Sequence, residues 1–539
     1  MRFPSRGWRC RAEDGSGPAA AAITIVRRGE RRGERPGRRR GAGGRTDRRR
    51  FLAGWFSPRR TAALAAGLLL AAAGCTADSG DDPKPGGPAQ ARRTARPAQP
   101  FGLKWNGYEH DARYDGVIDS YRGGGTFHDI TWCGVERVRG ERRWDAEDKV
   151  VDDALRHGYE LLVRIRIGSC WASGRPDAPA PRTSPSYPPA DLNAYRAFAG
   201  DLASRYAARG VHLFAIENEI DTANHWGADP AAYPAVARAG AEAVRRADPR
   251  ARLTDSGLSS SGYGIAVAEA LRAAGRRDEA LRFYREFGVR RGGERFPEAH
   301  DDGGLRAAFT TPAAARALAA HKANFGLDRD RVFDIVQLHY YDPWRLAGQV
   351  VDYIRRAVPA GTPIEAWEAG SFWPGQRYDP AAHARETAQL ATDLLARGVR
   401  RVVYLPLFYS PGAVAPQETW RALYTRDGTA RPAAAVLEKL RDATRTGTWR
   451  PYEGHGLRGA AVGLHRETDD STTLVLWSAD GTSQTLTAPS AGGTELTPLP
   501  GGRTRTWNAG TVTVGADPVI ISTRLPVTAA LDWLNGNAR

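Results

Sequence analysis

The chain has 539 residues, enough for two or more domains, and its formal net charge is +16. Residues 1–75 hold 18 Arg against 5 acidic residues, a balance of +13, which leaves only +3 for the rest of the chain. The basic excess therefore lies in the N-terminal segment, and it gives no indication that the folded part binds nucleic acid.

The first 75 residues have the order of an export signal. Arg48-Arg49-Arg50 resembles a twin-arginine motif, and the apolar stretch Thr61–Ala73 follows it. This stretch is shorter than the roughly 20 residues that a bilayer span needs, so we expect a signal peptide that is removed. Gly74-Cys75 ends the stretch like a bacterial lipobox, although Ala72 stands where leucine is usual. The pattern predicts lipidation of Cys75, and a plain secretory signal is the alternative.

Residues 76–98 are rich in Pro, Gly and charged side chains and poor in apolar ones. Such a segment cannot bury enough apolar surface to fold, so we predict a disordered tether. A tether behind a lipidated cysteine would hold the protein on the extracellular face of a bacterial membrane, with the N-terminal lipid as its only membrane contact. Without the lipid, the protein would be secreted.

Two of the four cysteines, Cys10 and Cys75, lie in the leader. The other two, Cys133 and Cys170, belong to the body of the protein. Exported proteins meet oxidising conditions, so we predict a disulfide between them. Two buried free thiols are the alternative.

Residues 99–445 alternate short β-prone runs with amphipathic helical stretches. This alternation is typical of a parallel sheet with crossover helices, and eight such units close a (β/α)8 TIM barrel. The predicted strands are PFGLKW, FHDITW, ELLVRIRI, HLFAIENE, ARLTDSGL, FDIVQLHYY, TPIEAWEAG and RVVYLPLFY.

Helices are predicted between these strands from apolar residues at three- and four-residue spacing. Examples are residues 146–157, 193–208, 234–247 and 381–396. Three glycines, Gly158, Gly210 and Gly398, stand where left-handed helix caps belong. The charged stretch 278–302 lengthens the link between the fifth and sixth strands, as a solvated helix face or as a rim loop.

The pattern of apolar and polar residues changes after about residue 446. Helical periodicity gives way to short alternating runs separated by Gly, Asp and Ser turns. We predict a small antiparallel β-sandwich over residues 446–525. Residues 526–539 are predicted to be a C-terminal tail or a short helix.

Two glutamates end predicted barrel strands, Glu219 on the fourth and Glu368 on the seventh. Hydrolysis of a glycosidic bond uses two carboxyl groups, one that protonates the leaving oxygen and one that attacks the sugar. The ends of barrel strands hold such groups rigidly and still admit substrate. The pair therefore indicates a glycoside hydrolase rather than two ordinary surface glutamates.

Two neighbouring carboxylates compete for these roles. Glu217 would face the same way as Glu219 in a regular strand, but deeper, where an unpaired charge is costly to bury. Glu365 lies three residues before Glu368 and would face the opposite side, toward the helices or the lower barrel. We select Glu219 and Glu368 and keep Glu217 as a rival.

Four strings in chain order resemble the retaining (β/α)8 glycoside hydrolases of clan A, most of all their β-xylosidase-like type with an appended β-sandwich. The resemblance covers residues 101–522. The strings are Trp132-Cys133-Gly134-Val135-Glu136 with Arg143-Trp144-Asp145, then Asn218-Glu219, Leu338-His339-Tyr340-Tyr341 and Glu368-Ala369-Gly370.

The resemblance implies roles for single residues. Glu219 would be the general acid/base, Glu368 the nucleophile, and Asn218 would hydrogen-bond the sugar 2-hydroxyl. The clan commonly has an arginine on strand two that orients the nucleophile, and this chain does not, so His128 is predicted to take its place. Many members also end strand eight with tryptophan, where this chain has residues 405–409, LPLFY.

Aromatic side chains would supply the rest of a sugar site, because the apolar face of a pyranose stacks on flat rings. We select Trp226 and Trp373, which follow the two catalytic strings. Core or rim packing is the alternative for each. His339 and Tyr341 share one face of strand six, so both are predicted to point inward. For His339, a structural histidine with satisfied hydrogen bonds is the alternative to sugar contact.

The two catalytic roles need different pKa values. We expect burial and a negative neighbour to raise the pKa of Glu219, and donors such as Tyr341 to keep Glu368 ionised. A retaining pair should stand about 5–5.5 Å apart. The sequence has no zinc-type histidine cluster and no phosphate-binding glycine loop, so neither a metal nor a cofactor is expected.

The sequence thus predicts an exported retaining glycosidase acting on a β-linked oligo- or polysaccharide. Two alternatives use the same scaffold: a catalytically silent carbohydrate-binding surface protein, and a transglycosylase. No nucleic-acid partner is expected, and the oligomeric state is not predicted.

Overall fold

The structure, a computed structural model, describes residues 97, 99–105, 112–176, 185–291, 296–371, 377–408, 421–425, 427–444 and 471–537. The predicted signal peptide with Cys75, almost all of the predicted tether, and Trp373 lie outside the described residues. Within them, no helix is both long and apolar enough to cross a membrane.

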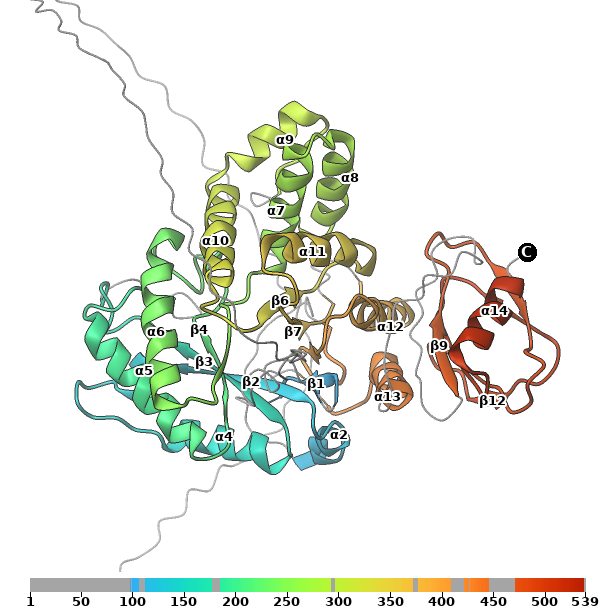
Figure 1. Cartoon of the computed structure of the whole chain (residues 1–539), viewed down its shortest axis with the longest axis horizontal. Coiled ribbons are helices and arrows are strands. Elements are labelled where there is room, and N and C mark those ends of the chain that lie inside the picture. Colours follow the sequence, from blue (N-terminus) through green and yellow to red (C-terminus); the bar gives the residue numbers. More distant parts are fainter. Residues whose placement is uncertain are drawn as a thin grey trace, which may run out of the picture. The chain divides into compact units, whose positions relative to one another are not determined.

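Eight parallel strands form the barrel, in chain order around its wall (Figure 1). The bridges Thr254↔Ile335 and Leu258↔Leu338 join its two four-stranded arcs on one side, and Gly102 packs against Gly125 on the other. The strands are β1 (Phe101–Leu103), β2 (Gly125–Thr131), β3 (Glu160–Arg166), β4 (Leu213–Ile216), β5 (Arg252–Thr254), β6 (Val336–Tyr340), β7 (Ile364–Ala369) and β8 (Val402–Tyr404). Each lies within or overlaps a predicted strand.

Helices surround the strands. Those of the barrel and its insertion are α2 (Asp115–Ser120), α3 (Trp132–Val135), α4 (Asp145–Arg156), α5 (Leu192–Ala207), α6 (Tyr233–Ala247), α7 (Ser260–Ala273), α8 (Arg277–Gly288), α9 (Asp302–Phe309), α10 (Pro312–Arg329), α11 (Trp344–Ala357), α12 (Pro380–Ala396) and α13 (Pro432–Thr444). The helix α8 overlaps the first part of the charged stretch 278–302, where a solvated helix face was one of the two alternatives.

Local sequence signals explain where the helices begin and end. Asp191 caps α5 by accepting hydrogen bonds from two backbone N–H groups of the first turn, and Asp379 caps α12 in the same way. Gly158, Gly210 and Gly398 have positive φ angles of 72°, 94° and 77°. The three predicted glycine caps are therefore confirmed.

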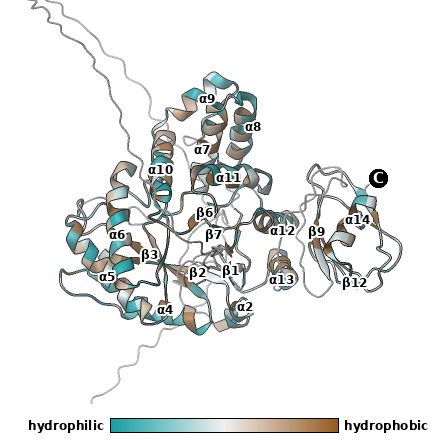
Figure 2. Cartoon of the chain, in the orientation of Figure 1, coloured by the Kyte–Doolittle hydropathy of each residue, from teal (hydrophilic) through white to brown (hydrophobic). Residues whose placement is uncertain are grey.

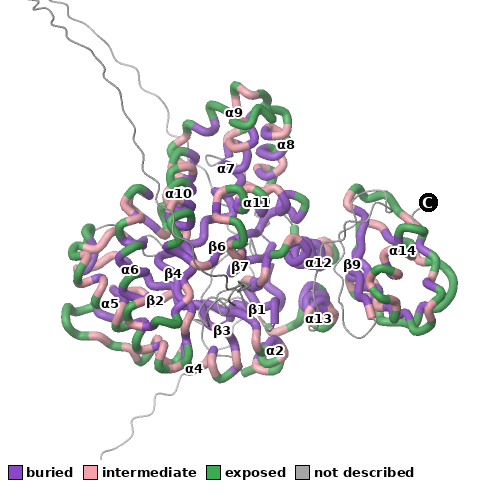
Figure 3. Tube along the Cα trace, in the orientation of Figure 1, coloured by how far each residue is buried: buried purple, intermediate pink, exposed green. Residues whose placement is uncertain are grey.

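The barrel has two apolar layers. A small cluster fills the space inside the strands, with Phe127, Leu162, Leu213, Trp367 and Val403 from five different strands. A larger cluster lies between the strands and the helices. Figure 2 shows helices with one apolar and one polar face, and Figure 3 shows buried strands behind helices whose outer faces are exposed.

The C-terminal part is an antiparallel β-sandwich, as predicted. Its sheets have the orders β12-β11-β14-β9 and β10-β13, and a terminal helix packs on their apolar cluster through Leu534. The elements are β9 (Thr472–Leu476), β10 (Gln484–Thr487), β11 (Glu495–Pro498), β12 (Arg505–Thr506), β13 (Thr511–Val514), β14 (Val519–Thr523) and α14 (Val527–Asn537). The predicted strand GAAVGLHRE lies outside the described residues.

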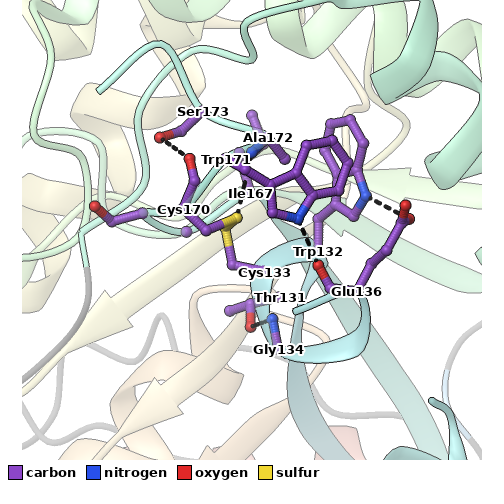
Figure 4. Close-up of a disulfide and its surroundings, with 12 residues drawn as sticks. Thr131, Trp132, Cys133, Gly134, Glu136, Ile167, Cys170, Trp171, Ala172 and Ser173 are labelled. Atoms are coloured by element: carbon purple, nitrogen blue, oxygen red, sulfur yellow. Dashed lines mark hydrogen bonds between the residues drawn. A yellow bond between two sulfur atoms is a disulfide. The ribbon is translucent and has the colours of Figure 1, made fainter. Parts of the chain in front are cut away.

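The structure joins Cys133 to Cys170 in a disulfide, as predicted (Figure 4). Cys133 lies on α3, which follows β2, and Cys170 lies in the loop that follows β3. Nearby, the indole N–H groups of Trp132 and Trp171 both donate to Glu136, one to its carboxylate and one to its carbonyl. These contacts tie together two loops at the C-terminal end of the barrel.

Candidate active site

The site begins where β4 ends, at Ile216. Glu217 and Glu219 both have positive φ angles, 64° and 41°, in the left-handed region that costs a side-chain-bearing residue on the order of 1–3 kcal/mol. The chain therefore leaves regular strand geometry here, and the face-sharing expected for a regular strand no longer applies. Two hydrogen bonds hold the turn, because the N–H of Glu219 donates to the carbonyls of Ser256 and Gly257 at 3.1 Å.

Glu217 lies beneath the site rather than in it. Its side chain is fully buried, and its Oε1 accepts a hydrogen bond of 2.8 Å from the backbone N–H of Ile167. Burial raises the pKa of Glu217 to about 7, although the nearby guanidinium of Arg166 opposes that shift. Glu217 is therefore not a rival for the acid/base role.

Glu219 reaches the site with its side chain 14% exposed. Its two carboxylate oxygens face two imidazoles, with Oε1 2.9 Å from Nδ1 of His339 and Oε2 3.4 Å from Nε2 of His225. Burial alone would raise the pKa of Glu219, but the hydrogen bond from His339 and the charges of both histidines hold it at about 2. The expectation of a raised pKa is wrong, because the sequence did not reveal these two donors.

Glu368, on β7, is held by two donors. Nη1 of Arg164 lies 2.5 Å from its Oε1, and the Tyr341 hydroxyl donates to its Oε2 at 2.6 Å. The contact predicted for Tyr341 is thus present. A buried guanidinium and a phenol that both donate to one carboxylate fix its position and its orientation.

Arg164 was missed by the sequence reasoning, and His128 was wrongly chosen in its place. His128 pairs with Glu147 of α4, because it alternates with Phe127 and Asp129, which face the barrel interior. Arg164, on β3, is 1% exposed and reaches Glu368 from inside the barrel. An arginine within a strongly apolar strand was the available signal, since a buried charge needs a partner.

His339 connects the two glutamates. Its Nδ1 lies 2.9 Å from Glu219 and 3.7 Å from Glu368, and its Nε2 lies 3.1 Å from the amide oxygen of Gln337. The ring is fully buried, so the structure favours the structural histidine over sugar contact. Gly257 permits this packing, because a Cβ there would lie 2.4 Å from Nε2.

An irregularity in β7 decides which of its glutamates faces the cleft. The register of β7 against β8 shifts between Ala366 and Ala369, so Trp367 and Glu368 both face the barrel interior although they are adjacent. Glu365 lies lower in the barrel, where it accepts a hydrogen bond of 3.0 Å from the Trp367 indole. Of the two positions expected for Glu365, the structure shows the lower barrel; the expectation that it faces the side opposite to Glu368 is wrong, because the irregularity in β7 turns both residues to the interior.

One carboxylate oxygen of Glu219, one of Glu368 and a ring nitrogen of His339 all lie within 4.8 Å of one another. The His339 nitrogen lies 2.9 Å from Glu219, at hydrogen-bond distance, so these two groups already have each other as partners. Glu368 is also committed to Arg164, whose charge would repel a cation. The three groups fit a hydrogen-bonded carboxylate pair better than a metal centre.

The structure tests only one of the two tryptophans that were predicted to stack on a sugar. Trp226 is fully buried, its indole N–H donates to the carbonyl of Asp229, and its ring packs edge-on against Tyr233. It therefore belongs to the core, and its selection as a sugar platform is wrong. Trp373 lies outside the described residues.

Asn218 lies beside the acid/base candidate. It is 3% exposed, its Nδ2 is 3.4 Å from Nδ1 of His225, and within the described residues its Oδ1 has no hydrogen-bond partner. A buried amide oxygen without a partner is costly, so it is available for a hydroxyl group of a ligand.

Two further charged groups complete the floor of the site. Asp129 lies 3.6 Å from Arg164 and 3.4 Å from Arg166, and these cations outweigh burial and lower the pKa of Asp129 to about 2. Lys104 donates to the carbonyl of Phe127, and burial lowers its pKa to about 7. The floor therefore carries charges of both signs around the two glutamates.

Comparison with known proteins finds solved structures that resemble this one. No protein-family model and no curated protein matches the chain. A family 39 glycoside hydrolase from Bacteroides cellulosilyticus WH2 matches with a TM-score of 0.52 and 14% identity, over 80% of this chain and 82% of that one. A glucosidase from Croceicoccus marinus matches with a TM-score of 0.49 and 12% identity, over 80% and 97%.

A third solved structure, a family 39 β-xylosidase from Caulobacter crescentus, has a TM-score of 0.46 and 14% identity, over 80% of this chain and 98% of that one. At such identities, the first of these likenesses shows a shared fold. The barrel followed by a β-sandwich is that fold, and any statement about chemistry depends on the site itself.

Proposed function

We propose that the protein is a retaining glycoside hydrolase that cleaves β-linked oligo- or polysaccharides. The observation that carries the proposal is the approach of Glu219 and Glu368, with one oxygen of each within 4.8 Å. Retaining enzymes hold their carboxyl groups about 5–5.5 Å apart, and inverting enzymes about 6.5–9.5 Å, to leave room for a water. The position of both groups at the C-terminal end of the barrel supports the same function.

The hydrogen bonds of Glu368 assign its role, and Glu219 takes the other role of the pair. Arg164 and Tyr341 hold Glu368 by hydrogen bonds to both of its oxygens, and this orients it as a nucleophile. It attacks the anomeric carbon while the glycosidic bond breaks and the departing oxygen takes a proton from Glu219. A water then gives a proton to Glu219, and its oxygen displaces Glu368 from the anomeric carbon. No metal or cofactor is needed for either step.

The surrounding groups support this mechanism. The amide oxygen of Asn218, which has no hydrogen-bond partner among the described residues, can accept a hydrogen bond from the sugar 2-hydroxyl. The second candidate, a catalytically silent binding protein, depended on a missing arginine beside the nucleophile. Arg164 makes that contact from β3 rather than from β2, so this support is lost. Transglycosylation would use the same residues with a sugar acceptor in place of water.

The function is tested by turnover of a panel of aryl β-glycosides. Glu368→Ala should abolish turnover. Glu219→Ala should regain activity with azide and form the β-glycosyl azide, because azide needs no general base. Glu298→Ala is the matched control, since its carboxylate is exposed. Inverted product from the wild type, or wild-type turnover by either catalytic variant, would contradict the proposal.

We further propose that the protein is exported and anchored through a lipid on Cys75. The support is the sequence of residues 48–75 together with the Cys133–Cys170 disulfide, a bond typical of oxidising compartments. Labelling of cells with a radioactive fatty acid should mark the wild type and not Cys75→Ser. Equal labelling of both proteins would exclude the anchor.

A further inference from the structure

The floor of the candidate active site has covered basic groups and accessible carboxylates. Three basic side chains lie on it, and none of them is more than 8% exposed: Lys104, Arg164 and Arg166. The side chain of Asp129 is 32% exposed, against 14% for Glu219 and 11% for Glu368. Among the described residues of the floor, the charges that a ligand can reach are therefore negative, and Asp129 is the most accessible of them.

Asp129 lies beside the candidate nucleophile. It stands opposite Arg164 in the ladder that joins β2 to β3, and both side chains face the barrel interior. Nη1 of Arg164 lies 2.5 Å from Oε1 of Glu368 and 3.6 Å from Oδ1 of Asp129. Because Glu368 and Asp129 share one guanidinium nitrogen, Asp129 lies within reach of the sugar whose anomeric carbon Glu368 attacks.

The carboxylate of Asp129 has unused acceptor capacity. A carboxylate can accept about four hydrogen bonds. Within the described residues Asp129 accepts one, on Oδ2 from Arg166, and this bond is long at 3.4 Å. Oδ1 is covered, so the exposed part of the carboxylate lies at Oδ2. Burial would raise the pKa of Asp129, but the charges of Arg164 and Arg166 lower it to about 2, so the group is an ionised acceptor.

We propose that Asp129 determines specificity: it accepts a hydrogen bond from a hydroxyl group of the sugar that Glu368 attacks, and its charge excludes sugars that carry a carboxylate there. The hydroxyl is not the 2-hydroxyl, because Asn218 is assigned to that group. A hydrogen bond to an ionised acceptor is about twice as strong as one between neutral groups, so this contact distinguishes a sugar with the hydroxyl from one without it. This inference rests on the proposed glycosidase function.

The charge of Asp129 also sets the class of substrate. A uronic acid would bring a second negative charge into a cleft where protein groups replace much of the water, and like charges repel strongly there. Arg164 and Arg166 do not offset this repulsion, because they are covered and already pair with carboxylates. The expected substrates are therefore β-linked chains of neutral sugars.

The first test is a cycle of substitutions in both the protein and the sugar. Its substrates are the aryl β-glycoside that the wild type hydrolyses best and the analogues of it in which one hydroxyl other than the 2-hydroxyl is replaced by hydrogen. Asp129→Ala should lower kcat/KM for the parent glycoside by about 10- to 10²-fold more than for one of these analogues. If Asp129 only balanced the charges of Arg164 and Arg166, the substitution would lower kcat/KM equally for the parent and every analogue, and the inference would be overturned.

The second test removes the charge and keeps the size. Asp129→Asn retains an acceptor oxygen, so the kcat/KM ratio of an aryl β-glycosiduronic acid to the neutral glycoside should rise by about 10-fold or more. An unchanged ratio would show that the charge excludes nothing. If Asp129→Ala does not fold, Asp129→Asn takes its place in the cycle, where a smaller loss should again be confined to substrates that keep the one hydroxyl.

Asp152→Ala is the matched control and should leave all of these rates unchanged. Asp152 is an aspartate of α4 that also pairs with an arginine, Arg209, but its side chain is 63% exposed on the outer surface. A wild type that prefers glycosiduronic acids to neutral glycosides would overturn this inference and leave the proposed function intact. A wild type inactive toward every β-glycoside would refute the proposed function, and this inference with it.

Discussion

The two ends of the barrel interior are built from the same residue types and differ in how these are paired. At the N-terminal end, Glu160 binds both Arg252 and Arg401, and Glu365 lies 3.6 Å from Arg401. Two negative charges there meet two positive charges. At the C-terminal end, Glu219 and Glu368 approach one another, and within the described part of the chain only Glu368 has an arginine as a hydrogen-bond partner.

Neither a buried charge nor a cavity is therefore enough to identify a catalytic site in this protein. A cavity of about 520 Å³ opens at the N-terminal end, lined by Glu160, Arg252, Glu365 and Arg401. Its carboxylates are neutralised by arginines, as in a structural network. Two carboxylates held close together, with histidines on one of them, form the arrangement that can move protons and attack carbon.

The first prediction compares one arginine from each end. Arg164→Met should lower kcat about 10²–10³-fold, because it removes the guanidinium that pairs with Glu368 and holds it in place. Arg401→Met should leave kcat per folded molecule nearly unchanged and lower the free energy of unfolding by about 3–5 kcal/mol, because it breaks a buried network. Steady-state kinetics and urea unfolding measure the two effects.

The comparison of the two barrel ends would be wrong if the two substitutions did not have these separate effects. An Arg401→Met protein of wild-type stability would mean that the N-terminal network contributes nothing to the fold. An Arg164→Met protein with wild-type kcat would remove Arg164 from the site.

The second prediction concerns Glu217, which lies below the catalytic end and is neutral at low pH. Because burial raises its pKa from 4.5 to about 7, the folded protein binds this proton more tightly than the unfolded chain. Its contribution to stability therefore falls as the pH rises from about 4.5 to about 7. Over that window Glu217→Gln should gain up to about 3 kcal/mol of stability relative to the wild type.

The measurement for Glu217 is chemical unfolding of both proteins at several pH values. Equal stability differences at pH 4.5 and pH 7.5 would show that Glu217 does not titrate between them. Glu298→Gln, at an exposed carboxylate, is the control and should show no such window.

The third and smallest effect is expected at His128. Its side chain pairs with Glu147 of α4 on the outer face of β2, so His128→Ala should change kcat by no more than a few-fold. A loss comparable to that of Arg164→Met would place His128 in the catalytic set after all.

Each residue that the sequence analysis missed or misassigned has its own physical reason. Arg164 meets Glu368 across 204 positions of sequence, and only the closed barrel brings these two strands together. The side chain of His128 points outward because side chains alternate along a strand and those of its two neighbours point to the barrel interior. Trp226 follows the catalytic string closely in sequence, but its hydrogen bond to Asp229 turns it into the core. Proximity in sequence could not distinguish core from cleft.

The eight strands, the sandwich and the two glutamates could be predicted from the sequence. Hydrophobic periodicity, glycine caps and strand-end carboxylates are local properties, and they survive in the fold. The details around them depend on contacts between distant segments. The positive φ angles at Glu217 and Glu219 and the register shift in β7 broke the alternation by which faces are assigned. The hydrogen bonds to Glu219 reversed its expected pKa, because the donors come from segments far apart in the chain.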